Sequence, residues 1–389
     1  MSRIRVAHLI TNFKLGGAQD YMVQIVKGLD RSTFEPLVAG RMEGEWVPLV
    51  KSLDGVRAFD IPSLRRDIAL FHDVRAILEI RRFCLQEHID VLHTHSSKAG
   101  VVGRLGAALS KSCAIVHTVH GFSFNQFMPW WQRTFFVQLE RCMSRFTTSL
   151  LIYSNGDYET AVKRGIGATR SVEKFYYGID FTPSSNPADR ARVRQEFGFD
   201  ERHHVIGFTG RFSEQKGLPI LLKAFALIHR QYPEARLLLV GDGPLRSRLE
   251  NECVRLDIQD AVRMTGFRSD IPEVLSAMDL FAMTSYWEGL SRSLAEAMLA
   301  KLPVVATDVG GTRDAVRNGE TGWLIPPDNV PAAVEALANA FANRDHAKRL
   351  AERGYQWARE AFDVATTNKR IADLYQVLVQ ERKSQRNSE

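Results

Sequence analysis

The chain has 389 residues, of which 45% are hydrophobic and 25% charged, so it can form two ordinary globular domains. It contains no run of eighteen apolar residues, which argues against a membrane-spanning helix, and the apolar part of its first ten residues is too short for a signal peptide. The four cysteines are scattered without a Cys-x-x-Cys pair, which predicts reduced, structural thiols in a cytoplasmic protein.

The net charge of +6 is unevenly distributed. Residues 1–180 contain 23 Lys and Arg against 17 Asp and Glu, so the whole excess lies in the first half. This indicates an anionic partner for that half, either a phosphate-bearing acceptor or an anionic membrane surface, and the alternative is an ordinary solvated surface. A nucleic-acid partner is not expected, because neither zinc-finger spacing nor an RNA-recognition signature accompanies the charge.

The chain opens with a Rossmann-like pattern. An apolar strand at 3–10 is followed by a loop ending in Gly16 and Gly17, and then by a helix at 18–29. Two adjacent glycines allow backbone amides to approach a phosphate or a sugar closely. There is no G-x-G-x-x-G motif, so a dinucleotide cofactor is not favoured.

Alternating strands and helices continue through the first half and predict a parallel sheet with ligands at the carboxyl ends of its strands. His95 and Lys98 follow the strand at 90–94, and His120 follows the strand at 114–119, so all three are candidate ligands, although each can also be a satisfied polar residue of a loop. The other strands are expected at 34–39, 150–154 and 172–176, and the helices at 71–87, 99–109 and 158–164.

Residues 122–146 combine many aromatic side chains with Arg133, Arg141 and Arg145. Rings interleaved with bases are typical of a segment at a membrane interface, and the alternative is a helix that faces the core with a charged back.

Residues 182–189 are rich in Pro, Ser and Asn and predict the boundary between two domains. After it, a strand at 205–209 leads into a loop with Arg211 and Lys216, followed by a helix at 218–230. An Arg and a Lys at the mouth of such a turn can hold a diphosphate, and we expect both to be exposed. The alternative is a basic surface loop.

Residues 284–327 predict a loop, a helix, a buried strand, a glycine turn, a further helix and strand, and a proline stop. Glu288 lies in the loop, and Glu296 falls about one turn inside the first helix, whose amides suit an anionic group. Carboxylates accept hydrogen bonds from hydroxyls, so the pair fits a ligand with both phosphate and sugar. Alternatively, Ser293 and Glu296 form a capping box, and Glu288 is a solvated loop acid.

This segment resembles the signature of the retaining glycosyltransferases of family four, which have the GT-B fold. The resemblance rests on Glu288-Gly289, on Glu296-Ala297-Met298, on the strand at 303–306 and on the turn Gly310-Gly311. Departures are mild, with Ser291, Lys301 and Asp314 at positions where other residues are common. The resemblance extends over nearly the whole chain and is most specific at 205–328.

The resemblance implies an α/β protein of two Rossmann-like domains facing a central cleft. We expect an acceptor-binding domain at 1–182, a nucleotide-sugar-binding domain at 183–364, and a C-terminal helix at 365–389 that crosses back to the first domain. The resemblance implies catalytic roles for His120, Arg211, Lys216 and Glu288. The donor would also meet Gly17, Phe267, Arg268, Gly289, Leu290, Ser291 and Glu296, and the acceptor Gly16, His95, Lys98 and His120.

The predicted reaction is transfer of a hexosyl group from a nucleotide-sugar, with a UDP-sugar favoured, and with retained anomeric configuration. The acceptor is expected to be a glycan or a polyprenyl-diphosphate-linked sugar of polysaccharide or lipopolysaccharide synthesis. No Asp-x-Asp motif is present, so we expect neither a metal nor another cofactor. The protein is expected to be cytoplasmic, with a possible peripheral place on the inner face of the plasma membrane. A nucleotide-sugar epimerase of the same fold, a phosphorylase, or a non-catalytic nucleotide-sugar-binding protein remains an alternative.

Overall fold

The structure, a computed structural model, describes residues 3–14, 16–124 and 127–388. Its contacts divide the chain into two compact units. Unit 1 comprises Met1–Gly178 and Asp363–Glu389, and unit 2 comprises Ile179–Phe362. The predicted domain boundaries, after residues 182 and 364, lie four and two residues beyond these divisions, which follow Gly178 and Phe362.

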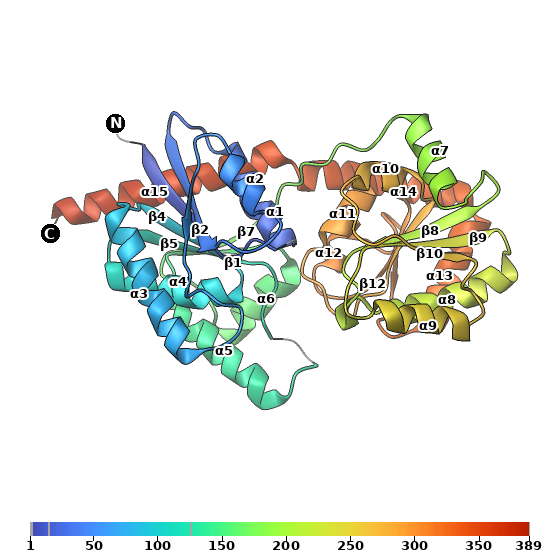
Figure 1. The fold of residues 1–389 in the computed structure, drawn as a ribbon, viewed down its shortest axis with the longest axis horizontal. Helices are drawn as coiled ribbons and strands as arrows, with labels where there is room; N and C mark the ends of the chain where they lie inside the picture. Colours follow the sequence, from blue (N-terminus) through green and yellow to red (C-terminus); the bar gives the residue numbers. More distant parts are fainter. Residues whose placement is uncertain (1–2, 15, 125–126, 389) are drawn as a thin grey trace. The chain divides into compact units, whose positions relative to one another are not determined.

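Unit 1 is built on a seven-stranded parallel sheet in the order β3-β2-β1-β4-β5-β6-β7 (Figure 1). The strands are β1 Ile4–Asn12, β2 Phe34–Arg41, β3 Arg57–Asp60, β4 Val91–His95, β5 Ala114–Val119, β6 Ser149–Ile152 and β7 Ser171–Lys174. The helices are α1 Gly17–Gly28, α2 Val47–Ser52, α3 Leu70–Gln86, α4 Ser97–Ser110, α5 Trp130–Ser144, α6 Asn155–Arg164 and α15 Val364–Ser388.

Helices cover both faces of this sheet, so its central strands are buried nearly throughout. One face packs Leu9 and Leu92 against Ile80 of α3 and Val102 of α4. The other face is covered by α1, α2 and α15. There Tyr375 of α15 reaches the sheet, so the C-terminal helix belongs to the core of unit 1.

Unit 2 is built on a six-stranded parallel sheet in the order β10-β9-β8-β11-β12-β13. The strands are β8 His204–Thr209, β9 Ala235–Val240, β10 Val262–Met264, β11 Leu280–Met283, β12 Val304–Thr307 and β13 Trp323–Ile325. The α-helices are α7 Pro187–Glu196, α8 Leu218–Gln231, α9 Arg246–Arg255, α10 Ile271–Ser276, α11 Arg292–Leu299, α12 Thr312–Ala315, α13 Val330–Ala342 and α14 Arg344–Ala361, and a 3₁₀ turn, η1, spans Glu214–Lys216.

The two Rossmann-like parallel sheets confirm the predicted α/β class. The sequence pattern indicates no strand or helix at α2, β3, α7 or the 3₁₀ turn η1. The predicted linker overlaps α7, which begins with Pro187 and is capped by Asn186. Arg194 on this helix is almost completely buried and, with Arg190, binds the carboxylate of Asp279 just before β11. These ion pairs attach α7 to the rest of unit 2. Because Asp279 is far from α7 in the sequence, the local residue pattern does not predict this helix.

No helix among the described residues is both long enough and apolar enough to cross a bilayer. Asn125 and Gln126, within the aromatic segment at 122–146, lie outside the described residues.

Candidate active site

The loops that follow three strands of unit 2 come together at the carboxyl edge of the sheet. The Gly241 amide donates to the carbonyl of Gly266 at 2.9 Å. A Cβ on Gly241, whose φ is +136°, would lie 2.0 Å from the carbonyl oxygen of Gly210. Only glycine permits this approach. The loops carrying Arg211, after Gly210, and Phe267, after Gly266, are therefore neighbours.

The Glu288 carboxylate has three side-chain partners at this edge. Its Oε1 lies 2.5 Å from the Lys216 Nζ and accepts a hydrogen bond from the Ser285 hydroxyl at 2.7 Å. Its Oε2 accepts from the amide of Gln215 at 3.2 Å. The Glu288 side chain is only 6% exposed, so it is not the solvated loop acid of the alternative interpretation.

The glycine turn of the sequence signature holds the backbone of Glu288. Gly310 has a φ of +43°, and a Cβ there would lie 1.8 Å from the Glu288 carbonyl oxygen. The next amide, that of Gly311, donates to the same oxygen at 3.3 Å. The two parts of the motif, 22 residues apart, therefore contact each other, and the glycine turn holds the backbone from which the Glu288 carboxylate extends.

The helix α11 begins beside Glu288, and its N-cap side chain makes no capping hydrogen bond. Ser291 is the N-cap residue, but its hydroxyl makes no capping bond and lies 3.1 Å from that of Ser293. The capping box between Ser293 and Glu296 is therefore wrong. The amides of a helix N-terminus, which here follow Gly289 and Leu290 in the chain, suit a bound phosphate.

Glu296 is 8% exposed and accepts a 2.7 Å bond from the Nε of Arg292, one turn earlier. Burial raises the pKa of this carboxyl, and Arg292 opposes part of that effect. A buried carboxyl with a shifted pKa marks Glu296 as a candidate ligand-binding residue.

The predicted cations differ in their surroundings. Arg211 is exposed and forms no ion pair with any residue that the structure describes. Lys216 was expected to be exposed, but its side chain is only 14% exposed because it packs onto Glu288. Arg268 is held by Asp270 and Glu196, whose hydrogen bonds raise its pKa, so its guanidinium is already occupied.

In unit 1, His120 follows β5 and is partly exposed. Its Nε2 lies 3.3 Å from the Nδ1 of His95 on β4. His95 has no exposed surface, which corrects its prediction as a direct acceptor ligand. It lies behind His120 instead.

The other predicted residues of unit 1 lie on two helix starts. Gly16 is the N-cap of α1, and Gly17 begins it, with open space where a Cβ would stand. Lys98, in the first turn of α4, forms a 2.5 Å ion pair with Asp73 of α3. This pairing leaves its predicted contact with an acceptor untested.

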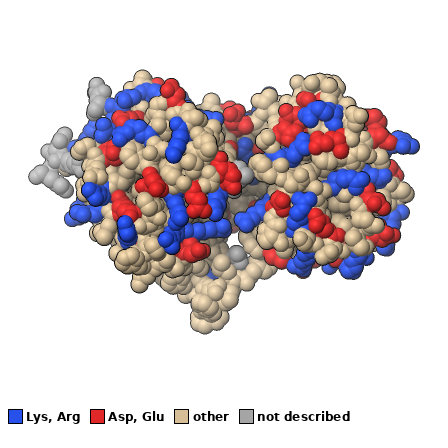
Figure 2. Space-filling model, viewed as in Figure 1, with Lys and Arg blue, Asp and Glu red and all other residues tan. Residues whose placement is uncertain are grey.

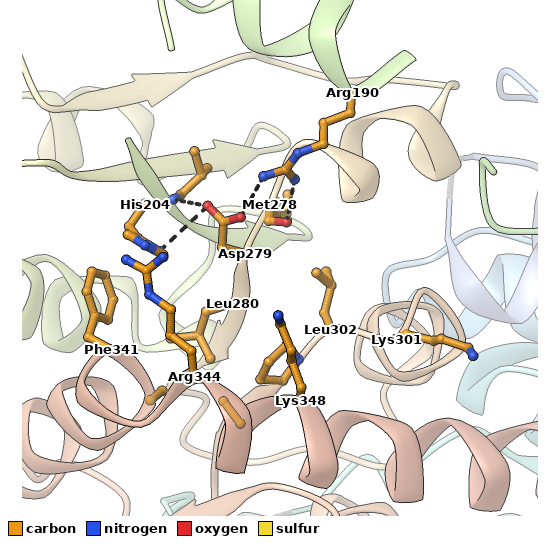
Figure 3. A pocket seen from close by; sticks show the side chains of 14 residues that line it. Arg190, His204, Met278, Asp279, Leu280, Lys301, Leu302, Phe341, Arg344 and Lys348 are labelled. Atoms are coloured by element: carbon orange, nitrogen blue, oxygen red, sulfur yellow. Dashed lines mark hydrogen bonds and ion pairs between the residues drawn. The ribbon is translucent and has the colours of Figure 1, made fainter. Parts of the chain in front are cut away.

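A pocket of about 380 Å³ lies at the opposite, amino-terminal edge of the unit 2 sheet, next to the starts of β8, β11 and β12. Figure 3 shows Arg190 bonded to Asp279 on one side, with Arg344 and Lys348 reaching from α14 on the other. The pocket is therefore on the far edge from Glu288, and we assign it no part in the site.

Two family models match the chain. Residues 16–172 match the "Glycosyl transferase 4-like domain", and residues 189–357 match "Glycosyl transferases group 1". Together they cover most of both units. The chain belongs to the group 1 glycosyltransferases.

Several bacterial glycosyltransferases are similar to this chain. It is 29% identical over 343 residues to the UDP-Gal:alpha-D-GlcNAc-diphosphoundecaprenol alpha-1,3-galactosyltransferase of Escherichia coli, covering 86% of this chain and 87% of that protein. It is 22% identical to the capsular polysaccharide biosynthesis glycosyltransferase CapM of Staphylococcus aureus, covering 85% and 88%. The solved structure of Anabaena Alr3699/HepE in complex with UDP-glucose superposes with a TM-score of 0.82, at 25% identity over 96% of this chain and all of that one.

The comparisons confirm the predicted family and the GT-B class of fold. Sequence reasoning missed the groups that hold the candidate carboxylates, namely Gln215, Ser285 and Arg292. Gln215 immediately precedes Lys216 on the 3₁₀ turn, and Arg292 precedes Glu296 by one helical turn, so spacing could have indicated both.

Proposed function

We propose that this glycosyltransferase moves a hexosyl group from a UDP-sugar to a lipid-linked sugar acceptor, with retention at the anomeric carbon. The observation that carries the proposal is the arrangement around Glu288. A diphosphate requires cations and amides, which Arg211, Lys216 and the start of α11 offer. Ribose and hexose hydroxyls require acceptors, which Glu288 and Glu296 offer.

The donor and acceptor classes are supported by the relatives. The Escherichia coli relative's name gives UDP-Gal as donor and a diphosphoundecaprenol-linked sugar as acceptor, and the Anabaena protein was solved with UDP-glucose. By analogy with these proteins, we infer a UDP-hexose and a polyprenyl-diphosphate-linked sugar for this chain.

The mechanism that suits these residues is attack from the face that the diphosphate leaves. Double displacement needs a free carboxylate nucleophile. Glu288 is already engaged by Lys216, Ser285 and Gln215, which favours a role in orienting the donor. As the glycosidic bond breaks, negative charge grows on the diphosphate, where Lys216, Arg211 and the α11 amides would stabilise it. The diphosphate oxygen would then take the proton of the acceptor hydroxyl. We propose that no metal is required.

We also propose that unit 1 rests on an anionic membrane surface when it meets its acceptor. At the start of α5, Trp130 is 71% exposed and Trp131 and Phe135 are each more than half exposed, as is Phe127 just before the helix. In Figure 2 the projection that corresponds to this part of α5 bears few charged side chains, whereas acids and bases are mixed over the rest of the visible surface. Exposed rings beside Arg133 favour the interfacial interpretation over a core-facing helix.

The test is release of UDP from UDP-glucose, UDP-galactose and their N-acetyl forms, with and without a polyprenyl-diphosphate-linked GlcNAc. The proposal predicts acceptor-dependent release and a product whose new linkage is α, as measured by NMR. An epimerase would convert the donor without acceptor, and a binding protein would show a donor-dependent thermal shift without turnover. A β-linked product would refute retention.

A further inference from the structure

A line of three imidazoles runs from the core of unit 1 to His120. The Nδ1 of His8, on β1, lies 3.1 Å from the Nε2 of His95. The Nδ1 of His95 lies 3.3 Å from the Nε2 of His120. His8 and His95 have no exposed surface, whereas His120 is partly exposed. Neither spacing nor family resemblance singles out His8.

All three rings are neutral near neutral pH. Burial lowers the pKa of His8 and of His120 to about 3, and that of His95 well below its usual value. The aromatic rings in contact with them are also uncharged, namely those of His93, Tyr21, Tyr153 and Tyr375. None of these contacts is with a carboxylate, so none of them stabilises a positive charge on the three rings.

A neutral imidazole carries one N–H, so the two hydrogen bonds of the line must run in the same direction. Either each Nδ1–H donates outward, from His8 to His95 and from His95 to His120, or each Nε2–H donates inward. The first arrangement leaves the Nε2 of His8 as a bare nitrogen, and the second leaves it as an N–H. Whether the Nε2 of His8 carries a proton is therefore tied to the direction of both hydrogen bonds.

The inner end has no partner among the described residues. The Nε2 of His8 is buried and makes no hydrogen bond. The neighbouring His93 cannot serve it, because its Nδ1 is bonded to the hydroxyl of Tyr375 at 2.5 Å and its Nε2 to that of Thr118 at 2.7 Å. An unpaired buried N–H is rarer in proteins than an unpaired acceptor. The outward direction is therefore favoured. The outer end is partly exposed, so it imposes no opposite preference.

We propose that His8 and His95 are positioning residues that fix His120 in the Nδ1–H tautomer. His120 then accepts from His95 at Nε2 and offers its Nδ1–H to a bound molecule. Such a donor suits a hydroxyl or phosphate oxygen, and the fixed tautomer prevents His120 from acting there as a base while it is neutral. This last step rests on the proposed glycosyl transfer, whereas the tautomer does not.

The direct test is NMR of the full chain with ring-¹⁵N-labelled histidine, at pH 7 and without substrate. The His120 signals are assigned by their loss in His120→Gln. His229 serves as an internal standard for the Nδ1–H tautomer, because its Nδ1 lies 3.1 Å from the backbone carbonyl oxygen of Ala235, which can only accept a hydrogen bond. We expect His120 to match it, with about a tenfold excess of Nδ1–H. Free histidine favours the other tautomer, so an Nε2–H or evenly mixed His120 would overturn the proposal.

Two variants separate positioning from mere packing. His95→Leu removes the donor to His120, so the His120 ring should become a mixture of tautomers. The kcat should fall about tenfold, with little change in UDP affinity. His95→Gln keeps a donor and an acceptor, so it should restore both the tautomer and most of kcat. If His95→Leu leaves the His120 spectrum unchanged while the protein stays folded, the line does not set the tautomer. That readout stands even if the activity assay finds no transfer.

Discussion

The pair formed by Lys216 and Glu288 gives a prediction that distinguishes the two cations of the proposed donor site, Lys216 and Arg211. The two side chains are 14% and 6% exposed, and their charged atoms are 2.5 Å apart. Arg211, in contrast, is exposed and has no ion pair with a described residue. We therefore expect Arg211→Ala to alter transfer but not folding, and Lys216→Met to alter both.

The magnitude follows from what each change leaves behind. Breaking a buried ion pair costs about 3–5 kcal/mol, because the remaining charge stays buried. After Lys216→Met, Glu288 keeps its bonds from Ser285 and Gln215, so we expect unit 2 to lose about 2 kcal/mol. Arg211→Ala should change stability by less than about 0.5 kcal/mol.

The assay is denaturant-dependent hydrogen exchange of the β8 and β11 amides, which follows unit 2 alone in a chain of two units. A double-mutant cycle with Glu288→Gln should give a coupling energy of about 1–2 kcal/mol, since the double variant buries no unpaired charge. Arg211→Ala is the matched control. If the effects of Lys216→Met and Glu288→Gln add within about 0.3 kcal/mol, the pair contributes nothing in solution and the reasoning is refuted.

Four further predictions follow from the same structure. Burial raises the pKa of Glu296, so the stability linked to its neutral form is present below pH 4.5 and is lost as the pH rises through the folded-state pKa. Glu296→Gln should therefore be at least as stable as the parent at pH 7. It should nevertheless bind UDP about 1.5–3 kcal/mol more weakly, as measured by calorimetry. Burial lowers the pKa of His8 to about 3, so the stability that its neutral form contributes is present above pH 6.5 and falls by roughly 1.4 kcal/mol per pH unit as the pH drops towards 3. The free energy of unfolding of unit 1 should therefore fall less steeply with decreasing pH in His8→Phe than in the parent, and equal slopes would contradict this. Transfer should continue in EDTA, and its loss with recovery on adding manganese would disprove metal independence. Flotation with anionic liposomes should be salt-sensitive and should weaken in the double variant Trp130→Ala and Trp131→Ala, whose melting temperature should hardly change; a parent protein that ignores such liposomes at low salt would leave the exposed rings without this role.

The sequence alone was sufficient for the α/β class and for most strands, and it indicated the candidate site that the structure then describes. Strand, turn and helix signals are local, so a buried apolar run such as β5 or a glycine turn such as Gly310-Gly311 is visible without a structure. The same locality explains the unexpected α7, whose buried Arg194 makes sense only once Asp279, 85 residues later, is beside it.

Only the tertiary structure decided how the candidate residues are partnered. From spacing, Glu288 could be a solvated acid, Lys216 an exposed cation, and His95 a ligand. Folding buried all three, pairing the first two and placing His95 behind His120. His8 had no local signal at all, because a histidine in the middle of an apolar strand acquires meaning only through the neighbours that β4 brings to it. Burial and hydrogen-bond partners depend on contacts between residues far apart in the chain, and those contacts set the charge and the proton positions on which the chemistry depends.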